Sequence, residues 1–269
     1  MGVERTDANY DIDAEFYEWV YSDADDVPFY LNLAKHFGGP ILEPMCGTGR
    51  LMVPLARAGY GVAGIDSHPG MFNIAKGNIA GEKASVKKRL ELHQMDIRDF
   101  DLKRKFKLVI VAFNGFLHLL KPPDRDSAMA CLARHVDPTG ALVIAVRNLK
   151  APGTAHGEQL DKMKDLGSGH LSRYSTIQED KDRPVMHIRF RYELYPADGR
   201  IENRETDFEL AVLQANQLKA VMEGAGLCVW ESFGGHHHEQ LTPRSDWIIH
   251  IARSREAMKD KISMDVKVL

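Results

Sequence analysis

The stretch that decides the fold is Glu43-Pro44-Met45-Cys46-Gly47-Thr48-Gly49-Arg50. It follows a short apolar strand at residues 40–43, and apolar residues at helical spacing run from Leu51 to Ala58 behind it. Glycines in such a loop let the backbone come close to a ligand, and the start of a helix offers free N–H groups to an anion. The stretch therefore predicts a ligand site where the first strand ends.

Strands and helices alternate beyond this loop. Further strands are predicted at residues 61–66, 90–95, 107–112 and 141–146, with helices at residues 69–80 and 125–135. A helix at residues 217–226 then precedes two last strands, at 227–233 and 246–253. Alternation of this kind indicates parallel strands joined by right-handed crossovers. We expect an α/β, Rossmann-like fold with a seven-stranded, mostly parallel sheet and helices on both faces.

Two segments do not follow the alternation. Residues 10–37 are helix-like and rich in aromatic side chains, which fits helices packed on a sheet edge or a lid over a pocket, and we expect residues 1–38 to form a helical lid. Residues 149–213 are expected to form an antiparallel insertion after strand 5, since residues 186–195 alternate apolar and polar side chains, a Pro-Ala-Asp-Gly turn follows, and residues 200–208 fit a returning strand. We expect one domain over residues 1–269, with the core at 39–148, the insertion covering the substrate and residues 214–269 ending the sheet.

Asp66 ends the second predicted strand, nineteen positions after Gly47. An acidic residue at about this distance binds the ribose hydroxyls in nucleotide-binding α/β folds, because a carboxylate accepts from both hydroxyls of a diol. The alternative is that Asp66 caps the helix that begins near Pro69. The two roles are compatible.

The amino-acid sequence of the loop narrows the class of ligand that it can bind. Gly49 is followed by Arg50-Leu51-Met52, so the third glycine of a dinucleotide loop is absent, as is the Gly-Lys-Ser/Thr of a P-loop. The loop resembles instead the first motif of class I S-adenosylmethionine-dependent methyltransferases. The resemblance covers most of the chain and extends to further stretches, which are residues 64–71, 95–97 and 113–119 and the ending formed by residues 225–227 and 246–249.

The resemblance implies a cofactor, S-adenosylmethionine, and a role for each matching residue. Glu43 would hold the loop and the cofactor amine, and Gly47 and Gly49 would allow close approach. Asp66 would bind the ribose, and Asp96 would accept a hydrogen bond from the adenine amino group. The remaining cofactor contacts implied are Met45, Ser67, Met71, Ile97 and Phe113.

One position departs from the resembled pattern. The family's fuller motif has a glycine two residues after the acidic one, where this chain has Met45. Either this is a variant that the loop tolerates, or it reshapes the pocket at the methionine end of the cofactor and accompanies unusual chemistry.

Candidates for the substrate side follow the fourth and fifth strands. Asn114 and His118 are the predicted catalytic residues, because an imidazole is suited to act as a base near pH 7. Arg147 is a candidate clamp for a carboxylate or phosphate, although it would equally pair with a protein carboxylate. Four tyrosines are candidate walls of the substrate pocket: Tyr17, Tyr21, Tyr174 and Tyr192.

The run His236-His237-His238-Glu239 invites a metal interpretation, but consecutive histidines do not all face one ion. We expect a loop there and no metal.

The net charge is −3, so no basic field attracts nucleic acid, and no segment is apolar enough to span a membrane. Three separate cysteines are typical of a reduced compartment, and we expect a cytoplasmic protein, a monomer or homodimer.

The function expected from the sequence is methyl transfer from S-adenosylmethionine to a nitrogen or oxygen of a small molecule. Three alternatives stay open. One is attack on another carbon of the sulfonium, by cyclisation or aminopropyl-type transfer, with methylthioadenosine as the product. The second is a module that binds the cofactor without turnover, and the third is an NAD-dependent oxidoreductase with the same fold.

Overall fold

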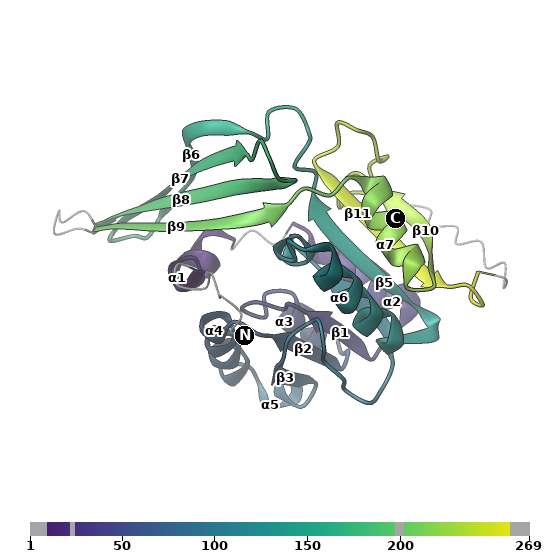
Figure 1. Ribbon diagram of the computed structural model, residues 1–269. Coiled ribbons are helices and arrows are strands. Elements are labelled where there is room, and N and C mark those ends of the chain that lie inside the picture. Colours follow the sequence, from purple (N-terminus) through teal and green to yellow (C-terminus); the bar gives the residue numbers. More distant parts are fainter. Residues whose placement is uncertain (1–9, 22–24, 197–201, 259–269) are drawn as a thin grey trace, which may run out of the picture.

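The computed structural model describes residues 10–21, 25–196 and 202–258 (Figure 1). Its core is a seven-stranded sheet with the strand order β10-β11-β5-β4-β1-β2-β3. β11 is antiparallel to both of its neighbours, and the pairs on the other side of β5 are parallel. The predicted mostly parallel sheet of seven strands is therefore confirmed. The strands are β1 (Ile41–Pro44), β2 (Val62–Asp66), β3 (Leu90–Gln94), β4 (Phe106–Val111), β5 (Val136–Arg147), β10 (Leu227–Phe233) and β11 (Trp247–Ser254).

Helices cover both faces of this sheet, because its inner strands are apolar on both sides. Successive side chains of a strand point to opposite faces, so Ile41 and Leu42 belong to two different apolar clusters. One cluster includes side chains of α2 (Val27–Phe37), α3 (Met52–Arg57) and α5 (Ala84–Lys87). The other includes side chains of α6 (Pro122–His135) and α7 (Ala215–Gly224). α4 (Pro69–Ala80) packs beside β2 and β3.

The predicted insertion forms a second sheet, which is antiparallel and has the order β6-β7-β8-β9. It contains β6 (His156–Asp165), β7 (Gly169–Glu179), β8 (Val185–Pro196) and β9 (Glu202–Ala211). β8 and β9 match the two strands expected here, whereas β6 and β7 were not predicted. Residues 197–199 of the predicted turn lie outside the described residues.

The inserted sheet lies on the side of the core sheet toward which β5 points (Figure 1). α1 (Tyr10–Val20) packs between β9 and α4, and the ring of Phe16 stacks on that of Tyr192 at 4.7 Å between centroids. The strand order reverses between β1 and β4, where crossovers depart in opposite directions. In open α/β sheets, ligands bind at the carboxyl ends of the strands beside such a reversal.

In the described part of the chain, no helix is both long and apolar enough to cross a membrane.

Candidate functional site

The loop after β1 curls tightly. Met45, Gly47 and Gly49 have φ values of 57°, 56° and 78°, in the left-handed region that favours glycine. The N–H of Cys46 donates to the carbonyl of Ile65 (3.0 Å), and the N–H of Gly47 donates to Oδ2 of Asp66 (2.8 Å). The loop is therefore fastened to the end of the neighbouring strand, β2.

Asp66 makes one of the hydrogen bonds that hold this loop against β2. Its Oδ2 accepts from Gly47 and its Oδ1 accepts from the N–H of His68 (2.8 Å). Burial raises the pKa of this carboxyl, and the two backbone hydrogen bonds oppose that rise. The cap of α4 is His68, whose Nδ1 accepts from the N–H of Met71 (3.3 Å). Each carboxylate oxygen of Asp66 retains acceptor capacity, as binding a diol requires.

Glu43 is buried with an unsatisfied oxygen. The residue is 4% exposed, and its Oε2 has no hydrogen-bond partner among the described residues. Burial raises the pKa of Glu43 to about 8, although the cation of Arg50 opposes the rise. Arg50 is itself held by Asp26 through two hydrogen bonds of 2.6 and 2.7 Å. A buried carboxyl with an oxygen that lacks a hydrogen-bond partner is suited to bind a cationic group, such as the ammonium of the predicted cofactor.

A cavity of about 510 Å³ opens in front of this loop, and we call it the cofactor cavity. Seven of the predicted cofactor residues line it, namely Glu43, Met45, Gly47, Asp66, Ser67, Met71 and Phe113. Gly49 is not among the described residues that line it; its φ of 78° favours glycine, and a Cβ there would make only an ordinary contact with Ala75 of α4 at 3.7 Å. The role of each residue in binding remains a prediction.

Asp96 and Ile97 are not among the described residues that line this cavity. Asp96 follows β3 at the same sheet edge as Asp66, but Arg98 holds both of its carboxylate oxygens (2.9 and 2.6 Å). Ile97 is buried in the apolar core. An adenine amino group would therefore share the carboxylate of Asp96 with Arg98.

A larger cavity of about 950 Å³ lies between the core sheet and the inserted sheet, and we call it the substrate cavity. Four of the predicted catalytic and substrate residues line it, namely Tyr21, Asn114, His118 and Arg147, and so does Phe113, a predicted cofactor residue. Asn114 has φ 69°, and its Oδ1 accepts from the backbone N–H of Arg147 (2.7 Å), which links the ends of β4 and β5. The exposed guanidinium of Arg147 lies 5.3 Å from the ring centroid of Trp247.

The other three tyrosines lie elsewhere than expected. Tyr17 lines the cofactor cavity. Neither cavity wall, within the described residues, includes Tyr174 or Tyr192. The ring of Tyr174 lies under the guanidinium of Arg191, at 4.2 Å. Alternation along β7 turns this ring away from the inner row of the inserted sheet, by which we mean the buried side chains on the face toward the core. Tyr192 is on the inner row but is buried beneath Phe16 of α1.

Among the described residues, four side chains line both cavities. Phe113 and His118 come from the segment after β4, and Ile188 and Phe208 come from the inserted sheet. His118 lies at the end of η1 (Gly115–His118). Burial, with a small contribution from nearby His68, lowers the pKa of His118 to about 4, so its imidazole is neutral near pH 7. The two cavities therefore meet at a boundary without a charged side chain, which we call the passage.

Several lining residues were not found from the sequence. Arg50 directly follows the glycine loop, which was the available signal. The alternation of residues 186–195 places Ile188 on a strand, and Phe208 ends the predicted returning strand, but neither pattern indicates a cavity. Arg173 had no local signal: its guanidinium is 4.2 Å from the ring centroid of Phe190 and donates to the hydroxyl of Tyr21 (2.7 Å).

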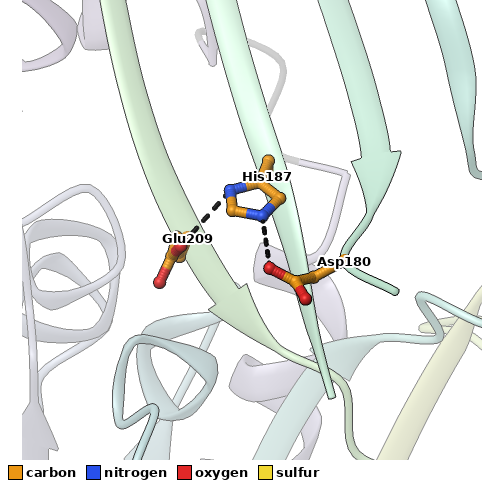
Figure 2. Close-up of side chains that lie close together, drawn as sticks. All are labelled: Asp180, His187 and Glu209. Carbon is orange, nitrogen blue, oxygen red and sulfur yellow. Dashed lines mark hydrogen bonds and ion pairs between the residues drawn. The ribbon is translucent and has the colours of Figure 1, made fainter. Parts of the chain in front are cut away.

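One group of potential metal ligands exists within the described residues, at Asp180, His187 and Glu209. Figure 2 shows the imidazole of His187 between the two carboxylates, with contacts of 2.8 and 3.2 Å. The guanidinium of Arg183 pairs with both carboxylates as well, and already supplies the balancing charge. His236, in the loop before β11, packs its ring on Trp247 (4.8 Å) instead of joining this group.

Comparisons with known proteins agree with the fold. Residues 41–140 match a family model described as a methyltransferase domain. A dTDP-3-amino-3,6-dideoxy-alpha-D-glucopyranose N,N-dimethyltransferase of Streptomyces fradiae is 26% identical over 199 residues, 72% of either chain. A glycine/sarcosine N-methyltransferase of Parasynechococcus marenigrum (strain WH8102) is 26% identical over 234 residues, 83% of this chain and 75% of the relative.

Solved structures give the same result. An S-adenosylmethionine-dependent methyltransferase from Clostridium acetobutylicum ATCC 824 superposes with a TM-score of 0.74 at 14% identity, covering 91% of this chain and 98% of that one. The domain match lies over the glycine loop and Asp66, and the buried carboxyl of Glu43 fits a cationic cofactor. The chain therefore contains a methyltransferase domain, has the fold of S-adenosylmethionine-dependent methyltransferases, and is an enzyme that uses this cofactor.

Proposed function

We propose that this enzyme methylates the nitrogen of a small-molecule amine that is larger than glycine. The observation that carries the proposal is the passage, where a spacious substrate cavity meets the cofactor cavity beside a neutral imidazole. The two relatives described above support nitrogen as the nucleophile, because one is named for an amino sugar and the other for glycine and sarcosine.

The size of the substrate cavity favours an acceptor of sugar size over an amino acid as small as glycine. At about 950 Å³ it has the volume of sites that hold drug-sized ligands. Its wall mixes aromatic rings with groups that bind hydroxyls and charges, including Tyr21, Arg147, Asp161, Arg173 and Trp247. The inserted sheet forms the roof of this cavity, which supports the proposal that it covers the substrate.

The passage favours an amine that arrives neutral. Nucleophilic attack needs the lone pair of the nitrogen, which an ammonium does not have. Phe113, Ile188 and Phe208 offer an ammonium no counter-charge, and the imidazole of His118 is uncharged near pH 7. A neutral imidazole accepts a hydrogen bond from an amine N–H, and so orients the lone pair away from His118 and along the passage.

S-adenosylmethionine, when bound, supplies a methyl group activated by a positive sulfur. The residues of this chain align and shield the reaction. Glu43, Asp66 and the loop backbone would hold the cofactor in its cavity, and the apolar residues of the passage exclude water between nitrogen and methyl group. Transfer would form the nitrogen–carbon bond as the carbon–sulfur bond breaks, releasing S-adenosylhomocysteine. The proton on nitrogen would leave to solvent, because the lowered pKa of His118 makes its imidazole a weak base.

A matched panel of acceptors tests the proposal. The purified chain is incubated with S-adenosylmethionine and glucosamine, glucose, glycine or serine, and the products are analysed by mass spectrometry. We expect methyl transfer to the amino sugar in preference to glycine, no transfer to glucose, and S-adenosylhomocysteine as the co-product. Transfer to glucose, or failure of every amine, would overturn it.

The co-product separates this proposal from the alternative chemistry suggested by Met45. Attack on a carbon other than the methyl carbon releases methylthioadenosine. Finding that compound with any acceptor would replace methyl transfer with cyclisation or aminopropyl-type transfer.

A further inference from the structure

We propose that Phe208, which belongs to the inserted sheet, is a substrate-contacting residue that shields His118 and closes the passage from above. The inference rests on the proposed function, since it assigns a residue to the place where the amine would meet the methyl group.

The position of Phe208 is the first support. Phe208 lies on β9, opposite Ile188 of β8 in the antiparallel register, and these two residues face both cavities. The opposite side of the passage comes from the core, through Phe113 and His118. The reaction site is therefore composite, because two of its four sides belong to a sheet that is separate from the cofactor-binding core.

The contact between Phe208 and His118 is the second support. Their ring centroids are 5.7 Å apart, and the planes are inclined by 35°. Phe190 supports Phe208 from the neighbouring strand with an edge-to-face contact at 5.5 Å. A ring held in this way limits both the rotation of the imidazole and the access of water to it.

The alternation of side chains along β9 explains why Phe208 faces the passage. Alternation along β9 places Thr206, Phe208 and Leu210 on one face of the strand, whereas Asp207 and Glu209 lie on the other face and also line the cofactor cavity. Thr206 and Leu210 are buried, whereas Phe208 is only half-buried, because it faces open space on both sides of the passage. An inward aromatic side chain that remains half-buried is available to contact a ligand.

The test compares Phe208→Ala with Met186→Ala. Met186 is an apolar residue on the inner row of β8, is buried, and does not line either cavity within the described residues. Both substitutions remove packing from the inserted sheet, but Phe208→Ala alone opens the passage. Phe208→Leu is the milder variant in case the alanine variant does not fold.

Two readouts are used. With the best amine of the acceptor panel, we expect Phe208→Ala to lower kcat about 10- to 100-fold, with little change in the KM for S-adenosylmethionine. Without any acceptor, we expect diethyl pyrocarbonate to acylate His118 several-fold faster in this variant, as measured by mass spectrometry of its peptide. The buried residues His135 and His250 serve as internal references. Met186→Ala should match the parent chain in both readouts.

Equal losses of kcat in the Phe208 and Met186 variants would overturn the proposal, as would an unchanged labelling rate of His118. Because labelling needs no acceptor, it separates the two proposals. If the panel finds no methylated amine while Phe208→Ala exposes His118, the proposed acceptor class fails and the shielding role of Phe208 stands.

Discussion

The two cavities are built in different ways. Nearly half of the residues that line the cofactor cavity come from one short part of the chain, residues 43–71, in which backbone N–H groups and two carboxyls lie close together in the sequence. The substrate cavity gathers side chains from α1, the segment after β4, the inserted sheet and the loop before β11. A local motif can therefore identify the first cavity, whereas only the tertiary structure assembles the second.

The two cavities are held in place by different interactions. The cofactor cavity is fixed by hydrogen bonds within the core, such as that between Gly47 and Asp66. The substrate cavity depends on how the inserted sheet sits over the core. Substitutions in the first should change cofactor affinity, and substitutions at the boundary should change the rate of transfer.

The largest effect is expected at the boundary, for His118→Ala. Loss of the imidazole removes the acceptor that orients the amine, and we expect kcat to fall about 100-fold, the lower range for a proton-transfer residue. Steady-state kinetics with the best amine of the panel measures this. The KM for S-adenosylmethionine should stay nearly constant. His118→Asn, which keeps a hydrogen-bond acceptor, should retain more activity, and equal kcat for the two variants would argue against orientation.

Asp66→Ala should have the next largest effect, and it acts on the other cavity. The variant loses acceptors for the ribose and for the N–H groups of Gly47 and His68, so the loop itself is loosened. We expect cofactor binding to weaken by about 2 kcal/mol, roughly 30-fold in Kd. Calorimetric titration measures the change, and Asp66→Asn is the control that keeps one acceptor. An unchanged Kd would remove Asp66 from the site.

Glu43 makes cofactor affinity depend on pH. Its pKa is raised to about 8 by burial, so the carboxyl is protonated in the free enzyme at pH 7. A bound ammonium favours the ionised form, so binding releases a proton below pH 8. Affinity should rise by up to about tenfold per pH unit toward pH 8 and then level off.

Glu43→Gln supplies the control, since it cannot ionise and has nearly the same shape. Calorimetry in two buffers of different protonation enthalpy reports the released proton directly. We expect proton release from the parent chain and less from the variant. Equal release from both would show that Glu43 does not face the cofactor amine.

The same contrast explains what the sequence could predict. α4 and β10 have the predicted limits, Pro69–Ala80 and Leu227–Phe233, because proline, glycine and apolar spacing mark their ends. β6 was missed, since it is an edge strand whose side chains are almost all exposed and which lacks apolar alternation. The alternation of β8 predicts which of its side chains share the inward face. It does not predict what that face covers, because no local sequence pattern specifies which part of the chain packs against a sheet.

The smallest effect is expected at Met45, the position that departs from the family pattern. Its φ of 57° is a conformation that costs a side-chain-bearing residue about 1–2 kcal/mol, which explains the glycine of the family motif. Met45→Gly relieves this cost but loses packing, since Met45 packs against the apolar core and lies beside Gly115. The two changes oppose each other, so we expect the free energy of unfolding to change by less than about 1 kcal/mol.

The variant also decides whether Met45 directs the chemistry. If Met45 only replaces a glycine, both the parent chain and Met45→Gly release S-adenosylhomocysteine, and the cofactor Kd changes only slightly. If the parent chain releases methylthioadenosine and the glycine variant releases S-adenosylhomocysteine, Met45 selects which carbon is attacked. That outcome would place a determinant of the reaction inside the cofactor cavity, and the division between a binding cavity and a reactive boundary would no longer hold.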